Sequence, residues 1–259
     1  MGMGRSGWPC VSVAIFAALL TSTAVGQKHP AVSRPKLTAE YVMDQGAAAM
    51  GPKSAWDKIQ SSIMEGSLTA IGPGTKLSGT LVLRAKRPNK FVLQQNVKGV
   101  GVTLQGYDGK VGWSKDPVRG LRKLEGAELA AVRRAAWFDA HIRWRQLYKK
   151  WQLVGTRKVK GRAAYLVRLI PAVGPMTLEY HDTKTFRLVR TDMVTETPQG
   201  PLPIEVYPEN YRSVKGALIP FTVRQRQKHP NGTVEVVIRI KTVRTNVPVS
   251  DSLFAMPKS

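Results

Sequence analysis

Cysteine is nearly absent from this sequence, because Cys10 is the only one among 259 residues. It lies just ahead of an apolar run near the N-terminus, in a segment that we expect to be removed. The remaining chain then has no thiol, which excludes disulfides, thiolate metal sites, haem attachment and cysteine nucleophiles. A chain without thiols is also undisturbed by an oxidising compartment.

Long apolar runs are equally scarce, and the longest lies at the N-terminus. Arg5 precedes the run from Val11 to Leu20, and Ala24-Val25-Gly26 offers small residues at the two positions that a signal peptidase recognises. The run is shorter than the roughly 20 apolar residues that a membrane span needs. We therefore expect residues 1–26 to be a cleaved signal peptide and residues 27–259 to form a single soluble domain. Export without disulfides indicates a bacterial periplasm.

Acidic residues are few, 17 against 40 lysines and arginines, and the formal net charge is +23. Such a surface attracts nucleic acid and anionic lipid without specificity. The basic residues are spread along the chain, which is typical of a solvated exterior. Base-stacking modules interleave exposed aromatic and basic side chains, whereas Tyr165 with Arg168 and Phe221 with Arg224 fall on the two faces of alternating strands. We expect no specific nucleic-acid partner, and an anionic membrane surface or envelope proteins stay as candidate partners.

Catalytic motifs are also missing. The sequence has no Gly-x-Ser-x-Gly elbow, no Ser-x-x-Lys with a recognisable partner motif and no phosphate-binding loop. Its four histidines show neither HExxH nor HxH spacing, and its carboxylates are scattered, mostly in turns and at strand ends. We therefore expect no enzymatic activity, no cofactor and no metal site.

Two short helices are predicted near the start of the mature chain. Apolar residues recur at helical spacing from Leu37 to Ile59, and Gly51-Pro52 interrupts the pattern. Beyond Ser61 the period changes to two, which predicts half-buried antiparallel strands with one apolar face. After Gln152 the same alternation predicts a meander of long hairpins.

Recurring turn sequences separate the predicted strands. In GYDGKVGWSKDP, residues 106–117, Asp108-Gly109 is a dipeptide favoured in two-residue hairpin turns, and we expect Asp108 to close the turn with its side chain. Val-Lys-Gly occurs three times between strand-like runs, and its glycine supplies the positive φ that such turns need. These and the remaining predicted turns are at residues 97–99, 159–161, 214–216, 181–185 and 229–232.

A helical insert of about residues 125–150 interrupts the alternation. Glu125 to Phe138 is rich in good helix formers, and Asp139 is expected to cap a second short helix. Three tryptophans would share one face of a continuous helix, with basic residues crowding the rest: Trp137, Trp144 and Trp151. We favour packing of these rings against the sheet. The alternative is an interfacial membrane helix, which combines an aromatic face with a basic one.

The order of elements resembles that of the LolA/LolB-like family of periplasmic outer-membrane lipoprotein-sorting proteins. Both have a helix pair, about five antiparallel strands, a helical insert and a second set of hairpins. The segments that carry the resemblance are GYDGKVGWSKDPVRGLRKLEGAEL from residue 106, YHDTKT from residue 180, YRSVKGALIPFTVRQ from residue 211, and NVP from residue 246 followed by Phe254. These are mostly turn and strand signatures, which bear on the fold more than on activity.

The resemblance implies an α+β, mainly β fold, in which a curved antiparallel half-barrel is covered by a helical lid and its cavity receives acyl chains. Leu129 to Trp144 then corresponds to the lid. The apolar side chains expected to line the cavity are Leu81, Leu83, Phe91, Leu93, Val102, Leu104, Trp113, Trp137, Phe138 and Trp144.

The implied function is an exported, non-enzymatic protein that binds a lipid or lipoprotein acyl chain, in the trafficking of outer-membrane lipoproteins or lipids. The alternative is a basic accessory domain that docks onto a cell-envelope complex and holds no small ligand.

Overall fold

Two short helices open the part of the chain that the computed structural model describes, which comprises residues 36–197, 200–229 and 232–258. They are α1 (Ala39–Ala48) and α2 (Lys53–Asp57), as the sequence predicts. The Thr38 hydroxyl caps α1 by accepting a hydrogen bond from the Tyr41 N–H at 3.1 Å. The predicted signal peptide lies outside the described residues.

A single antiparallel sheet of 13 strands follows. The strands are β1 (Ser61–Gly72), β2 (Thr75–Lys86), β3 (Lys90–Val97), β4 (Gly101–Tyr107), β5 (Gly112–Asp116), β6 (Gly120–Lys123), β7 (Lys150–Val159), β8 (Arg162–Ile170), β9 (Thr177–Asp182), β10 (Leu188–Thr197), β11 (Gly200–Val214), β12 (Ala217–His229) and β13 (Gly232–Thr245). Their spatial order is β6-β5-β4-β3-β2-β1-β13-β12-β11-β10-β9-β8-β7. Two meanders are therefore joined through the pairing of β1 with β13, and β6 and β7 form the two outer edges.

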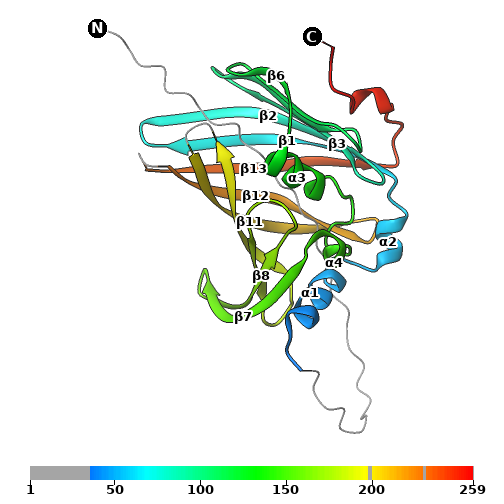
Figure 1. Cartoon of the computed structure of the whole chain (residues 1–259), viewed down its shortest axis with the longest axis vertical. Coiled ribbons are helices and arrows are strands. Elements are labelled where there is room, and N and C mark those ends of the chain that lie inside the picture. Colours follow the sequence, from blue (N-terminus) through cyan, green and yellow to red (C-terminus); the bar gives the residue numbers. More distant parts are fainter. Residues whose placement is uncertain (1–35, 198–199, 230–231, 259) are drawn as a thin grey trace.

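The helical insert connects these two edges. It runs from the end of β6 to the start of β7 and contains α3 (Gly126–Ala135) and α4 (Trp144–Leu147). Because β6 and β7 lie at opposite edges of a strongly curved sheet, the connection has to pass over the concave side (Figure 1). The fold is therefore the predicted one, a mainly β, open and curved sheet whose concave side is covered by a helical segment.

The insert differs from its prediction in detail. The second helix is only four residues long, and its N-cap position is Arg143, not Asp139. The Asp139 carboxylate instead accepts hydrogen bonds from Arg143 at 2.6 Å and from Arg87 at 3.1 Å. Burial alone would raise the pKa of Asp139, but these two hydrogen bonds hold it below its usual value.

The three tryptophans do not form one helical face, because Trp151 lies in β7. The rings of Trp144 and Trp151 pack edge to face at 4.8 Å, next to α1. Trp137 is half-buried, and the Arg143 guanidinium lies 4.8 Å from the centre of its ring. The interfacial-helix alternative therefore loses its basis.

The predicted turn at residues 229–232 lies partly outside the described residues, and the other predicted turns are present, with two differences in length. Lys160-Gly161 and Lys215-Gly216 are two-residue turns in which both residues have positive φ. The loop after β3 has three residues, since Val97 pairs with Gly101. The loop after β4 has four, since Tyr107 pairs with Gly112, and the Asp108 carboxylate closes it by accepting from the N–H groups of residues 110 and 111 at 2.7 Å.

The main core fills the concave face of the sheet. It combines side chains from β1 to β3 and β11 to β13 with Val132 and Ala136 of the insert. A smaller cluster lies on the opposite face, where the C-terminal segment covers Trp113, whose Nε1–H donates to the Phe254 carbonyl at 2.8 Å. The C-terminal residues thus close the outer side of β3 to β5, while the insert closes the inner side.

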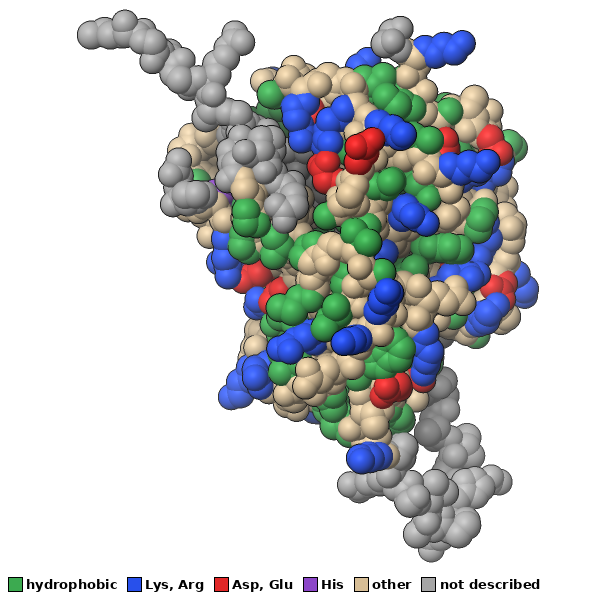
Figure 2. Space-filling view, viewed as in Figure 1, with side chains coloured by type: hydrophobic (Ala, Val, Ile, Leu, Met, Phe, Trp, Pro, Cys, Tyr) green, Lys and Arg blue, Asp and Glu red, His purple; other side chains and the backbone are tan. Residues whose placement is uncertain are grey.

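The surface is basic without a single dominant block. On the face seen in Figure 2, lysine and arginine side chains are interspersed with hydrophobic and acidic ones. This agrees with the solvated basic exterior that the sequence predicts. No helix in the described ranges has the length and apolar character needed to cross a membrane.

Candidate functional site

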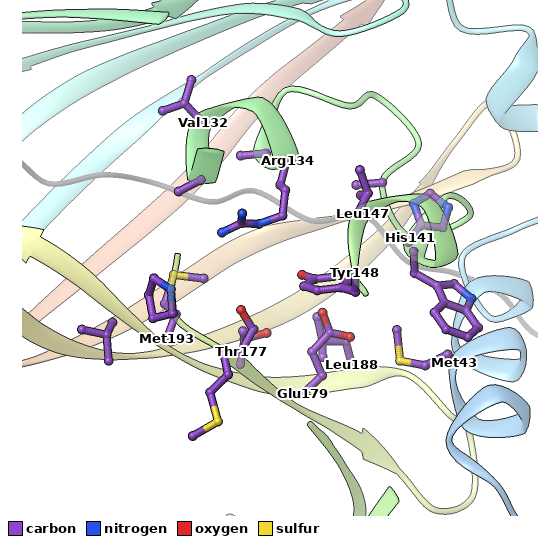
Figure 3. Close-up of a pocket in the computed structure, with 18 of the residues that line it drawn as sticks. Met43, Val132, Arg134, His141, Leu147, Tyr148, Thr177, Glu179, Leu188 and Met193 are labelled. Atoms are coloured by element: carbon purple, nitrogen blue, oxygen red, sulfur yellow. The ribbon is translucent and has the colours of Figure 1, made fainter. Parts of the chain in front are cut away.

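A cavity of ≈ 180 Å³ lies between α1, the helical insert and strands β9 and β10 (Figure 3). Its lining from α1 and the turn that follows it is Met43, Gly46, Ala47 and Met50. The insert contributes Ala127, Glu128, Ala131, Val132, Arg134, Ala135, Ala140, His141, Trp144, Leu147 and Tyr148. The sheet and the loop before β9 contribute Gln105, Pro175, Met176, Thr177, Glu179, His181, Leu188, Thr191, Met193, Val194 and Thr195.

The lining is largely apolar and adaptable. Methionines face the cavity from three directions: Met43 from α1, Met176 from the loop before β9 and Met193 from β10. Methionine has several rotatable bonds and a polarisable sulfur, so it fits apolar guests of differing shape. The small side chains of Ala127, Ala131 and Ala135, one helical turn apart on α3, keep the insert side of the cavity open.

Helix α3 is lightly attached to the rest of the molecule. Val132 is its only fully buried side chain. At its C-terminal end, the Arg134 Nη1–H donates to the Val173 carbonyl at 2.9 Å. Near its start, Glu128 accepts two hydrogen bonds from Arg122, at 2.6 Å and 2.8 Å. Leu129 also packs against the main core, and these few contacts are what an outward movement of α3 has to break.

A buried acid–base pair lies at the sheet side of the cavity. His181 Nε2 is 3.1 Å from the Glu179 carboxylate, and His181 Nδ1 is 3.0 Å from the Phe186 carbonyl. The two buried side chains therefore pair with each other, and the Phe186 carbonyl occupies the second ring nitrogen. Gly46 makes room for the ring, because a Cβ there would be 2.8 Å from two of its atoms.

Two further polar side chains face the cavity from the insert. Burial raises the pKa of the Tyr148 hydroxyl. Burial also lowers the pKa of His141 from 6.5 to about 3, so its imidazole is neutral at pH 7. The His141 ring packs against Trp56 at 4.5 Å, and its buried Nε2 has no hydrogen-bond partner among the described residues.

Of the ten residues predicted to line a cavity, Trp144 does so. Five others lie on the concave face, where they belong to the main core or pack against it: Leu81, Leu83, Phe91, Leu93 and Phe138. A role for these five in holding a guest stays a prediction. Trp137 lies in the insert but not in the lining.

The prediction is wrong for Val102, Leu104 and Trp113, which lie on the outer face. Leu93 pairs with Gln105, and Leu104 therefore falls opposite Gln94. A two-residue turn after Val97 would have placed Leu104 opposite Leu93, but the three-residue loop shifts the register by one and turns these side chains over. Leu104 and Trp113 pack in the outer cluster, and Val102 is 43% exposed.

Several lining residues were not predicted from the sequence, among them Met43, Arg134 and Met193. One signal was available in β9, where Thr177, Glu179 and His181 alternate and so place three polar side chains on one face. A strand with a polar face toward the core is a sign of a lined cavity, because buried polar groups need partners. Within the described residues, no cluster of three or more histidine, cysteine or acidic side chains could hold a metal ion.

The curved open sheet, its helical cover and the cavity between them define a LolA-like half-barrel. The fold comparison agrees, since a crystal structure of a LolA superfamily protein from Nitrosomonas europaea matches with a TM-score of 0.57 over 85% of this chain and 98% of that chain, at 14% identity. A putative outer membrane lipoprotein-sorting protein domain from Vibrio parahaemolyticus matches with a TM-score of 0.56 over 83% and 97% of the two chains, at 12% identity.

A DUF1329 family protein from Desulfovibrio piger is similar as well, with a TM-score of 0.56 over 84% of this chain and 97% of that chain, at 16% identity. No protein-family model matches the sequence, and no curated protein matches it either. At these identities the likeness establishes the fold, and the function has to be argued from the cavity.

Proposed function

We propose that this protein is an exported, non-enzymatic binding protein that holds an acyl chain of a lipid or lipoprotein in the cavity beneath α3. The observation that carries the proposal is the lining of that cavity, in which methionine, alanine and leucine side chains from α1, the insert and β10 face one another. Binding sites for small molecules are typically concave and mostly apolar, with a few placed polar groups. Export rests on the signal peptide predicted for residues 1–26.

The size of the cavity sets what it can hold. Its ≈ 180 Å³ is close to that of an engineered cavity of about 150 Å³ that takes up benzene. Small-molecule pockets more commonly have about 300–1,000 Å³. The cavity as it stands therefore accepts one segment of an acyl chain, and a longer guest requires α3 to move outward. That movement has to break the few contacts of α3.

The test begins with native mass spectrometry of the mature protein purified from a bacterial periplasm, followed by extraction of any lipid that co-purifies. A stoichiometric lipid or lipopeptide that stays bound at high salt supports the proposal, because apolar binding responds little to salt. Uptake of a fluorescent fatty acid is then compared for Ala131→Phe and Ala130→Phe. Ala131 lines the cavity, and Ala130, on the same helix, does not.

We expect Ala131→Phe to reduce uptake strongly and Ala130→Phe to leave it near the wild-type level. An empty wild-type protein that also takes up no fatty acid would overturn the proposal. The formal charge of +23 would then favour the alternative, a basic domain that docks onto acidic envelope partners. That alternative predicts partner binding that weakens steeply as salt is raised.

A further inference from the structure

Arg134 is a cation in the lining of an otherwise apolar cavity. Its side chain leaves α3 and extends over Tyr148 and Met193 into the cavity (Figure 3). One N–H of its guanidinium is used by the Val173 carbonyl, at 2.9 Å. Among the described residues no carboxylate lies within ion-pair distance of Arg134. A guanidinium has five N–H donors in a planar fork, so most of this donor capacity can serve a guest.

The other ionisable side chains of the lining have partners or are neutral. Glu179 is paired with His181, at 3.1 Å, and Glu128 is held by the two hydrogen bonds from Arg122. His141 is neutral at pH 7, since burial lowers its pKa to about 3. Burial lowers the pKa of Arg134 too, but an arginine stays protonated at neutral pH. Among the described lining residues, Arg134 is therefore the charged side chain that no other side chain pairs with.

An anion on the guest is the chemistry that completes this arrangement. A partly desolvated charge without a partner is unfavourable, and a carboxylate or phosphate oxygen supplies charge-assisted, two-pronged hydrogen bonds to the guanidinium fork. Met193 lies near Arg134 and Met43 lies on α1 at the other end of the cavity, with Tyr148, Thr177 and Glu179 between them, so an acyl chain directed toward α1 meets apolar side chains at both ends (Figure 3).

We propose that the cavity selects amphiphiles with an anionic head group, a carboxylate or a phosphate, which binds Arg134 while the acyl chain extends toward α1. This rests on the proposed function and adds the chemical class of the guest. A neutral acyl chain would fill the apolar part equally well but would leave Arg134 without an anion.

The test compares three guests of equal chain length on the mature protein at 0.15 M salt by calorimetry: dodecanoate, dodecyl phosphate and 1-dodecanol. We expect at least one of the two anions to bind about tenfold or more tightly than the alcohol, the size of a charge-assisted hydrogen bond. Arg134→Gln should remove that preference, and Arg134→Lys should retain part of it. Arg133→Gln is the matched control, because Arg133 is exposed on the same helix and does not line the cavity.

Each outcome is decisive. If the wild-type protein binds the alcohol as tightly as both anions, the head-group inference is wrong while acyl binding stands. If it binds none of the three, the proposed function itself fails. Arg134 also attaches α3 to Val173, and loss of that attachment alone would weaken all three guests by the same factor. If Arg134→Gln weakens the binding of all three guests by the same factor, the role of Arg134 is to hold the helix. If Arg133→Gln removes the preference for anions as fully as Arg134→Gln does, the preference comes from the basic surface.

Discussion

Stability between pH 7 and pH 5 should depend on His141. Its pKa falls from 6.5 in the unfolded chain to about 3 in the folded protein, because burial disfavours the imidazolium. A histidine with a lowered folded pKa contributes stability above its unfolded pKa, and this contribution is lost as the pH falls below 6.5 toward 3. At pH 5 the unfolded chain binds a proton at His141 and the folded protein does not.

The size of the effect follows from linkage. Each pH unit below the unfolded pKa costs about 1.4 kcal/mol, so the step from pH 7 to pH 5 removes about 2 kcal/mol of unfolding free energy. The carboxylates contribute little in this window, because their unfolded pKa values are near 4. The sequence has three other histidines, and a variant is needed to isolate His141.

The assay is urea unfolding followed by tryptophan fluorescence at both pH values. His141→Phe keeps an aromatic ring against Trp56 and removes the titration, so it should lose about 2 kcal/mol less than the wild-type protein. His229→Gln, at a half-buried position in β12 away from the cavity, should behave as the wild type. Equal losses in the wild-type protein and His141→Phe would refute the buried, neutral state of His141.

Three further substitutions test other parts of the structure. Asp139→Asn weakens the acceptor that holds two arginines and should lower the unfolding free energy by about 2–3 kcal/mol. Asp57→Asn, in an exposed ion pair, is the control and should change it by less than about 0.5 kcal/mol. Similar losses for the two variants in urea unfolding would contradict this prediction. Gly66→Ala places a Cβ 2.3 Å from the Arg239 carbonyl oxygen, where β1 meets β13, and should cost about 2–3 kcal/mol in the same assay. Val132→Asp should loosen α3 and speed limited proteolysis within residues 124–143 while the unfolding midpoint of the sheet changes little. Unchanged cleavage would show that α3 is held by other contacts.

The strands and turns were predictable because their signals are local. Period-two alternation marks a strand wherever one face is buried, and Lys160-Gly161 and Lys215-Gly216 form tight turns because glycine tolerates positive φ. Helices α1 and α2 followed from spacing and from the break at Gly51-Pro52. The length of the second insert helix was overestimated. Asp139 accepts hydrogen bonds from two arginines and does not cap the helix, and the residues after α4 have to reach the start of β7.

The cavity was not predictable in the same way, because its residues come from segments far apart in the chain. Met43 lies on α1, Arg134 on the insert and Met193 on β10, and only the packing of α1 and the insert against the folded sheet brings them together. Of the residues predicted to line a cavity, Trp144 is the one found around this cavity, and it lies in the insert, whose covering role the family resemblance implied.

The amino-acid sequence by itself determined the secondary structure, the basic character and the expectation of a curved sheet under a helical segment. Tertiary structure decided which face each strand shows to the inside. A loop of three residues after Val97 puts Leu104 outside, where a loop of two would have put it inside, since side chains alternate with a period of two. It also decided where the cavity lies, because pairing of β1 with β13 makes β6 and β7 opposite edges and obliges the insert to cross between them.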